Sequence, residues 1–136
     1  MLKIKIASLA LWTLTMAAHA ATPQEILKFY LDEAARAQPG FTASTQRGAR
    51  FYRHPFNHNA VMPACKTCHT DNPTRPGQHV VTGKDIKPLS PRTNADRFTD
   101  PAKVAKWFRR NCTEVLGREC SAAEKADLIS YLMEAN

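Results

Sequence analysis

The sequence predicts an all-α fold for a single small domain. Thr22–Glu25 and Ser121–Glu124 each have the pattern of a capping box, and apolar residues recur at spacings of three and four after both. No segment shows the regular apolar and polar alternation of a half-buried strand, and no internal repeat is evident. Helices packed around one modest core are therefore expected.

Residues 1–20 have the organisation of a secretory signal peptide. Lys3 and Lys5 precede an apolar run over 6–18, and Ala18-His19-Ala20 is a cleavage pattern of the small-x-small type. A retained membrane anchor is the weaker interpretation, because the run is shorter than the roughly 20 residues that span a bilayer. We therefore predict cleavage after Ala20 and a single mature domain, residues 21–136, that is periplasmic or otherwise extracytoplasmic and has no stable membrane anchor.

Two helices are expected in the first part of the mature chain. The first runs from Pro23 towards Ala37 and stops at Pro39-Gly40, because Thr22 supplies an N-cap hydroxyl and Pro23 suits the first helical position. Its apolar face comprises Ile26, Leu27, Tyr30 and Ala34. A second, short helix is expected from about Ser44 to Arg53.

Two further helices are expected after a long loop. Residues 70–100 are rich in proline and have little periodicity, which favours a loop laid over a surface rather than a free linker. Asp100-Pro101 predicts the cap and first residue of a helix that ends near Arg110, and Ser121 caps the terminal helix. The residues expected to be buried are Val104, Trp107 and Phe108 in the first helix and Leu128, Ile129, Leu132 and Met133 in the second.

Cys65-Lys66-Thr67-Cys68-His69 is the C-x-x-C-H pattern of covalent haem attachment. Two intervening residues let both thiols reach vinyl groups on one porphyrin edge, and the His69 imidazole lies beneath the iron as proximal ligand. A redox dithiol or half of a zinc site shares the C-x-x-C spacing, but a second Cys/His pair at zinc spacing is missing. The sequence therefore predicts a small class I-like c-type cytochrome, with one haem c bound to Cys65 and Cys68 and an extra N-terminal helix.

The distal side of the iron has no obvious ligand in the sequence. Met62 precedes the attachment motif too closely to cross the macrocycle easily, and Met133 lies on the apolar face of the terminal helix. His79 is chemically the strongest donor downstream of the motif, because a neutral imidazole binds both oxidation states of iron. The other candidates are Lys84, Lys87, Asn94 and Asn111, whereas His54 and His58 suit a solvated loop.

Three segments in the last third of the chain carry a family resemblance. They are Arg97-Phe98-Thr99-Asp100-Pro101, Lys106-Trp107-Phe108-Arg109-Arg110-Asn111-Cys112 and Val115-Leu116-Gly117-Arg118-Glu119-Cys120. Together with the attachment motif, the Thr82-Gly83-Lys84 turn and Pro88-Leu89-Ser90-Pro91, they resemble the monohaem cytochromes typified by the sphaeroides haem protein. These are related to the c''-type cytochromes, which have a redox-labile distal ligand. The resemblance covers about Phe51 to the C-terminus.

The resemblance implies a distal ligand and a disulfide. The family places its ligand just before the first cysteine of a local pair, so Asn111 would bind iron and Cys112 and Cys120 would form the bridge. Related cytochromes have His where this chain has Asn111. From the residues alone, Asn111 is more typical of a position just after a helix. An oxidising compartment and the even number of cysteines left after haem attachment also favour a bridge.

The resemblance further implies a redox-gated gas site. An amide oxygen is neutral and hard, so it suits ferric iron better than ferrous iron. Reduction by another cytochrome, such as a dihaem c-type one, would release Asn111 and admit O₂, NO or CO. The alternatives are a simple electron carrier with a permanent distal ligand such as His79, and a small oxygen or nitric oxide reductase. An enzyme is less favoured, because only Arg109 and Arg110 adjoin Asn111 as candidate acids.

The charge of the chain is compatible with a redox partner. Loss of residues 1–20 leaves 116 residues and lowers the formal net charge from +7 to +5. A basic surface without runs of like charge favours an acidic redox partner or an anionic membrane surface, although solubility alone explains it equally well. Nucleic acid is not an expected partner, since no known binding motif occurs and the mature protein lies outside the cytoplasm.

Overall fold

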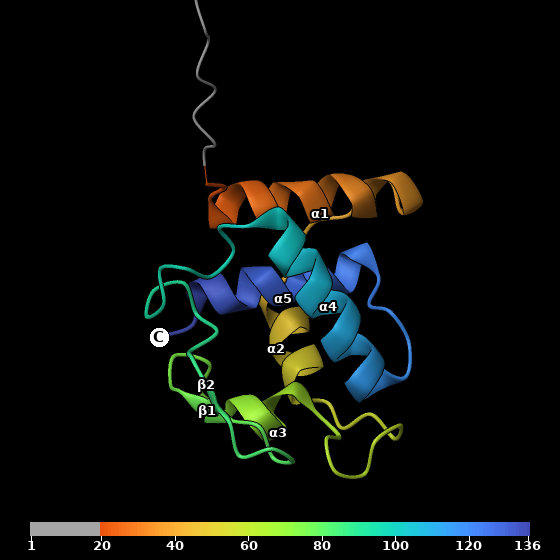
Figure 1. Ribbon diagram of the computed structural model, residues 1–136. Helices are drawn as coiled ribbons and strands as arrows, with labels where there is room; N and C mark the ends of the chain where they lie inside the picture. The colour runs from red at the N-terminus through yellow and green to blue at the C-terminus, as the bar shows by residue number, and fades with distance from the viewer. Residues whose placement is uncertain (1–19) are drawn as a thin grey trace, which may run out of the picture.

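The structure, a computed structural model, describes residues 20–136. Its elements are α1 (Pro23–Ala37), α2 (Thr45–Arg53), α3 (Cys65–His69), β1 (Gly77–Gln78), β2 (Asp85–Ile86), α4 (Pro101–Leu116) and α5 (Ala122–Glu134). α5 lies between α1 and α2 and packs against both, and α3 lies at the end of α2 that is remote from α1 (Figure 1). The predicted all-α class is confirmed. The predicted signal peptide lies outside the described residues, apart from Ala20.

α1 begins and ends where the sequence predicts. Thr22 Oγ1 accepts a hydrogen bond from Glu25 N (3.2 Å), and the Glu25 carboxylate accepts one from Thr22 N (2.7 Å). The capping box is therefore complete, and it satisfies N–H groups that have no partner inside the helix. The buried residues of α1 are Ile26, Tyr30 and Ala34.

The crossing of α2 and α5 depends on Gly48 and on the buried Asp127. A Cβ atom added to Gly48 would lie 2.0 Å from the carbonyl oxygen of Asp127, so only glycine permits this approach. The Asp127 carboxylate accepts hydrogen bonds from Ser44 N (2.7 Å) and from Arg47 Nε (2.7 Å). α5 thus supplies a negative charge to the N-terminus of α2, where free N–H groups and the helix dipole favour it.

α4 begins directly after its predicted N-cap, Asp100, but ends later in the chain than predicted. The sequence predicted an end near Arg110, whereas the helix runs to Leu116 and stops at Gly117, whose φ of 73° favours glycine. Asn111 therefore lies inside the helix and not just after it. Helical spacing of the core positions continues past Arg110, since the buried residues of α4 are Val104, Cys112 and Val115.

Trp107 is a second difference from the predicted core. Its side chain is 41% exposed, whereas Val104 is buried and Phe108 packs against the core from a partly buried position. Successive residues of a helix are about 100° apart, so Trp107 lies at the edge of the stripe that contains Val104 and Phe108. The Arg110 guanidinium lies over the Trp107 ring, 5.7 Å from its centroid.

Residues 70–100 are largely irregular, as predicted, but they contain a short strand pair that the sequence did not predict. β1 and β2 are antiparallel, with Gly77 opposite Ile86. The later part of the segment packs onto the end of α5, because Ser90 is fully buried and Arg92 Nε donates to Met133 O (3.1 Å). The loop is therefore held to the core at its second half and to α3 at its first half.

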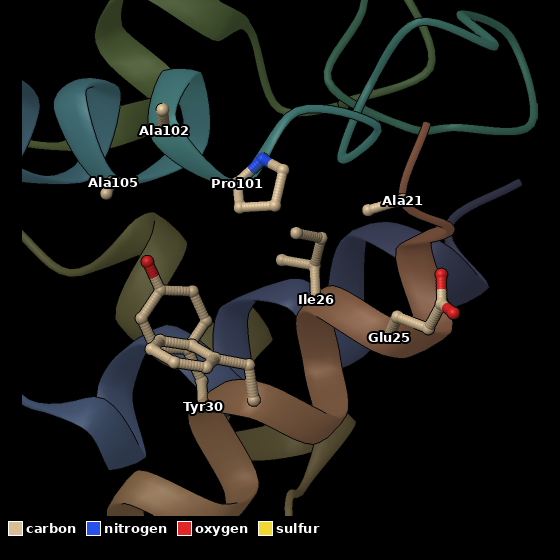
Figure 2. A pocket seen from close by; sticks show the side chains of 8 residues that line it. Ala21, Glu25, Ile26, Tyr30, Pro101, Ala102 and Ala105 are labelled. Carbon is tan, nitrogen blue, oxygen red and sulfur yellow. The ribbon is translucent and has the colours of Figure 1, made fainter. Parts of the chain in front are cut away.

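An apolar cavity of about 360 Å³ lies between α1 and the start of α4 (Figure 2). Ile26 and Tyr30 of α1 face Pro101 across it, and Ala105 completes the wall on α4. This cavity is remote in sequence and structure from the C-x-x-C-H motif, none of whose residues lines it. Within residues 20–136, no helix combines the length and apolar character needed to cross a membrane.

Candidate haem site

The attachment motif forms the single-turn helix α3, and α2 holds its C-terminal end. Tyr52, a fully buried residue of α2, donates its hydroxyl hydrogen to the carbonyl oxygens of His69 (3.0 Å) and Thr70 (2.7 Å). Thr70 has a positive φ of 64°, which ends the helix directly after the histidine. The buried Tyr52 thus ties the C-terminal backbone of the motif to the hydrophobic core.

β1 fixes the other side of the motif. A Cβ atom added to Gly77 would lie 2.0 Å from the carbonyl oxygen of Cys68 and 2.9 Å from the Cα atom of His69. Strand and helix therefore touch backbone to backbone, which requires a residue without a side chain. Figure 1 shows the strand pair directly beside α3.

The two motif cysteines are free thiols suited to thioether formation. Cys65 and Cys68 are both partly exposed and are not joined to each other. Burial raises the pKa of the Cys65 thiol to about 11, which is opposite to the lowered pKa of a reactive redox dithiol. Among residues 20–136 there is also no group of three or more His, Cys, Asp or Glu side chains that could hold a metal ion, as a zinc site would require.

His69 is held as a neutral imidazole. Partial burial, with smaller Coulombic effects of Arg97 and His79, lowers its pKa to about 4. At neutral pH the ring therefore has a free lone pair, which is the form that coordinates iron. Two thiols and one neutral imidazole on a single helical turn form the donor set of a covalently bound haem.

The open face of α3 also fits a haem. None of the five residues of α3, all of which the structure describes, is buried. Cys65 nevertheless packs against the hydrophobic core, together with Leu89 and Phe108 from the two segments that follow. A flat apolar macrocycle attached here would cover the motif and extend the core.

His79 lies in the loop directly after β1, the strand whose Gly77 contacts α3. Its Nδ1 accepts hydrogen bonds from Val81 N (3.2 Å) and Thr82 N (3.3 Å). These two bonds engage the Nδ1 lone pair of His79, so that nitrogen is less suited to bind iron.

Asn111 lies on α4, with its side chain exposed, directly before a disulfide. Cys112 and Cys120 are bonded and both are 5% exposed, so the bridge joins the last turns of α4 to the start of α5. The same part of α4 is tied to the segment before the motif, since Asn59 Nδ2 donates to Glu114 O (3.2 Å). The disulfide and this hydrogen bond therefore both hold the C-terminal part of α4, which contains Asn111. The hydrogen bond also joins it to the segment that precedes α3.

Two residues outside the predicted set of iron ligands, Tyr52 and Arg97, also support this site. Arg97 is partly buried, and its guanidinium donates to the carbonyl oxygens of Pro88 (2.8 Å) and Lys87 (2.8 Å). Burial lowers the pKa of Arg97 from its ordinary value. Their roles depend on the tertiary contacts, because their hydrogen-bond partners lie up to 18 residues away in the chain.

Comparisons with known proteins agree with this site. The family described as "Domain of unknown function (DUF1924)" matches residues 38–132. Cytochrome c'' of Methylophilus methylotrophus is 38% identical over 131 residues, which cover 92% of this chain and 91% of that protein. The cytochrome c-type protein SHP of Cereibacter sphaeroides is 44% identical over 112 residues, which cover 82% of each.

A solved structure agrees as well. The structure of oxidized SHP, described as an oxygen binding cytochrome c, superposes with a TM-score of 0.75 at 39% identity and covers 83% of this chain and 96% of that chain. The likeness thus extends over most of this chain and nearly all of the solved one. The chain therefore belongs to the DUF1924 family and to the c-type cytochromes of the c'' and SHP kind, with a covalently attached haem c as its cofactor.

Proposed function

We propose that the chain is a periplasmic cytochrome that accepts an electron from a redox partner and, once reduced, releases Asn111 from the iron so that O₂, NO or CO can bind. In this proposal Cys65 and Cys68 hold the haem and His69 is the proximal ligand. The location of Asn111, directly before the Cys112–Cys120 disulfide on a helix tied to the entry of α3, supports the distal assignment most strongly.

The chemistry of the two iron ligands accounts for the gating. The haem supplies the redox iron when bound. The His69 imidazole is neutral at physiological pH and binds both oxidation states, so it remains in place. The Asn111 amide oxygen is a hard neutral donor, which loses most of its advantage when the iron gains an electron. Only the distal position would therefore open on reduction.

The solved SHP structure carries the printed description of an oxygen binding cytochrome c, and this supports a gas-binding role here. A permanent His79 ligand is the less favoured alternative, because the Nδ1 atom of His79 already accepts two backbone hydrogen bonds. The reductase alternative has no observation in its favour.

Absorption spectra of the haem-loaded mature protein test this function. We expect a six-coordinate ferric form, a five-coordinate high-spin ferrous form, and a large shift of the ferrous spectrum when CO is added. A ferrous spectrum that stays low-spin and does not respond to CO would instead establish a simple electron carrier.

A further inference from the structure

One face of α4 combines positive charge with a large exposed aromatic ring. Lys103, Lys106, Trp107 and Arg110 recur at spacings of three and four, so they share one side of the helix. All four side chains are exposed, and Trp107 has 41% of its surface open. We call these four residues the α4 basic face. In Figure 1 the helix crosses in front of α5, with no described element drawn over it.

The charges of this face are largely free. α4 carries four cations and one acid, Glu114, and the printed ion pairs within residues 20–136 include neither Lys103 nor Lys106. The Arg110 guanidinium has two contacts. Its Nε lies 3.5 Å from Glu114 Oε1, and the group lies over the Trp107 ring. That stacking holds the indole ring against a cation and keeps it on the outer side of the helix.

Exposed tryptophan beside arginine is unusual on a surface that only contacts water. Aromatic residues and arginine are enriched at the centres of protein interfaces, where they contribute most of the binding energy, while charges at the rim set the encounter rate and the choice of partner. Lys103 and Lys106 supply such a rim, and it is complementary to an acidic protein.

The face also lies close to the iron site. Trp107 is one turn before Asn111 on the same helix, so a molecule docked on Trp107 would lie beside the distal side of the haem. Electron transfer slows steeply with distance, and a donor gains from docking there. We propose that the α4 basic face is the docking surface for the acidic protein that donates the electron. This inference rests on the proposed function, in which the haem accepts an electron from a partner.

The rate of haem reduction by an acidic protein tests the inference. Haem-loaded mature protein is mixed in a stopped-flow instrument with reduced flavodoxin, an acidic electron-transfer protein, at low and high ionic strength. We expect Lys103→Glu/Lys106→Glu to lower the second-order rate constant about tenfold at low ionic strength and to remove most of its salt dependence. Trp107→Ala should lower the rate constant at both ionic strengths, because its contribution is not screened by salt.

A matched variant separates this surface from net charge. Lys28→Glu/Arg36→Glu on α1 changes the net charge by the same amount at two exposed positions, neither of which lines the cavity between α1 and α4. We expect it to lower the flavodoxin rate constant less than about threefold. Equal losses in the two double variants would overturn the docking surface and show that only net charge matters.

A small uncharged reductant controls for the haem itself. Photoreduced lumiflavin needs no docking surface, so its rate constant should be the same in the wild type and all three variants. A haem that lumiflavin cannot reduce would reject electron acceptance, and a ferrous wild type that does not bind CO would reject the gas site. Neither result resembles the selective loss of the flavodoxin rate that the α4 basic face predicts.

Discussion

Tyr52 connects the hydrophobic core to the attachment motif through one hydroxyl group. The ring is fully buried and packs near Tyr131, while the hydroxyl donates to the carbonyl oxygens of His69 and Thr70. Burial raises the pKa of Tyr52 well above its ordinary value, so the phenol stays protonated and continues to donate. The position of the proximal histidine thus depends on a residue seventeen positions earlier in the chain.

Tyr52→Phe should therefore destabilise the protein more than an ordinary loss of one hydroxyl. It leaves two carbonyl oxygens without their donor, and we expect a loss of about 1–3 kcal/mol in the free energy of unfolding, measured by urea denaturation. The matched control is Tyr131→Phe, which removes only a bond from Arg53 Nη2 (3.1 Å) and should cost about 1 kcal/mol or less. Equal losses in both variants would refute the special role of Tyr52.

Asn111 offers the most direct residue-scale test of the gating proposal. Asn111→His supplies a nitrogen donor that binds both oxidation states, so the ferrous protein should become low-spin and bind CO more slowly. Asn111→Ala should leave the ferric site open or water-filled. The spectra of both oxidation states report these changes.

His79→Ala is the control for the distal assignment. Because Asn111 is the proposed ligand and Nδ1 of His79 is engaged by the backbone, removal of His79 should change neither the ferric nor the ferrous spectrum much. A loss of the ferric low-spin signal in His79→Ala, with the signal retained in Asn111→Ala, would reverse the assignment.

Glu124 should make stability depend on pH at the acid end. Its carboxylate bonds Arg118 and accepts a hydrogen bond from Ser121 N (2.8 Å), and these contacts lower its pKa below the ordinary value. The stabilisation is fully present above the ordinary pKa and is lost as the pH falls through the lowered one. Glu124→Gln should cost about 1 kcal/mol at pH 7 and nearly nothing at low pH, measured by thermal unfolding across pH. Curves that stay parallel at all pH values would contradict this.

At the scale of elements, α4 and the Cys112–Cys120 disulfide act as one unit. The bridge closes a short loop from the last turns of α4 to the start of α5, and α5 is the helix that packs against both α1 and α2. Motion of the Asn111 segment relative to the core is thereby restricted, which a reversible distal ligand requires if it is to return to the iron.

Loss of the bridge should reduce stability and loosen the distal side. For a loop with a sequence separation of 8, the chain-entropy relation gives about 2.5 kcal/mol for Cys112→Ala/Cys120→Ala, measured by urea denaturation. The ferric high-spin fraction should rise at the same time, because Asn111 is less well held. Unchanged ferric spectra in this variant would show that the disulfide does not position the ligand.

At the scale of the whole molecule, the haem is expected to complete the core. Residues buried from α1, α2, α4 and α5 form one cluster, whereas α3 contributes only the partly buried Cys65. The part of the domain around α3 therefore has fewer buried apolar side chains than the part around α1 and α5. A covalently bound macrocycle supplies apolar surface there, much as a bound metal does in small metal domains.

Protein without haem should consequently fold incompletely. Cys65→Ala/Cys68→Ala prevents attachment, and we expect helical far-UV dichroism with a weak near-UV signal, since fixed packing around the motif would be lost. The control is Cys112→Ala/Cys120→Ala, which keeps the haem and should keep the near-UV signal. A native-like near-UV spectrum in the haem-free variant would contradict this expectation.

Local chemistry in the sequence determined most of the helices. Thr22, Ser44, Asp100 and Ser121 each cap the helix that the sequence predicted, because a side-chain oxygen within three residues satisfies the first N–H groups. The predicted end of α4 near Arg110 is wrong, because the helix continues to Leu116. Gly117 and the spacing that continues through Val115 were the better signals.

The sequence by itself determined the cofactor chemistry, because the spacing of Cys65, Cys68 and His69 is a local property of one helical turn. Only the tertiary structure decided which residues surround that turn. The hydrogen bonds of the Tyr52 hydroxyl and the approach of Gly77 to Cys68 both depend on segments that meet through folding. Such contacts join residues far apart in the chain, where no spacing rule applies, so the packing of α2, β1 and α4 around α3 had to be known.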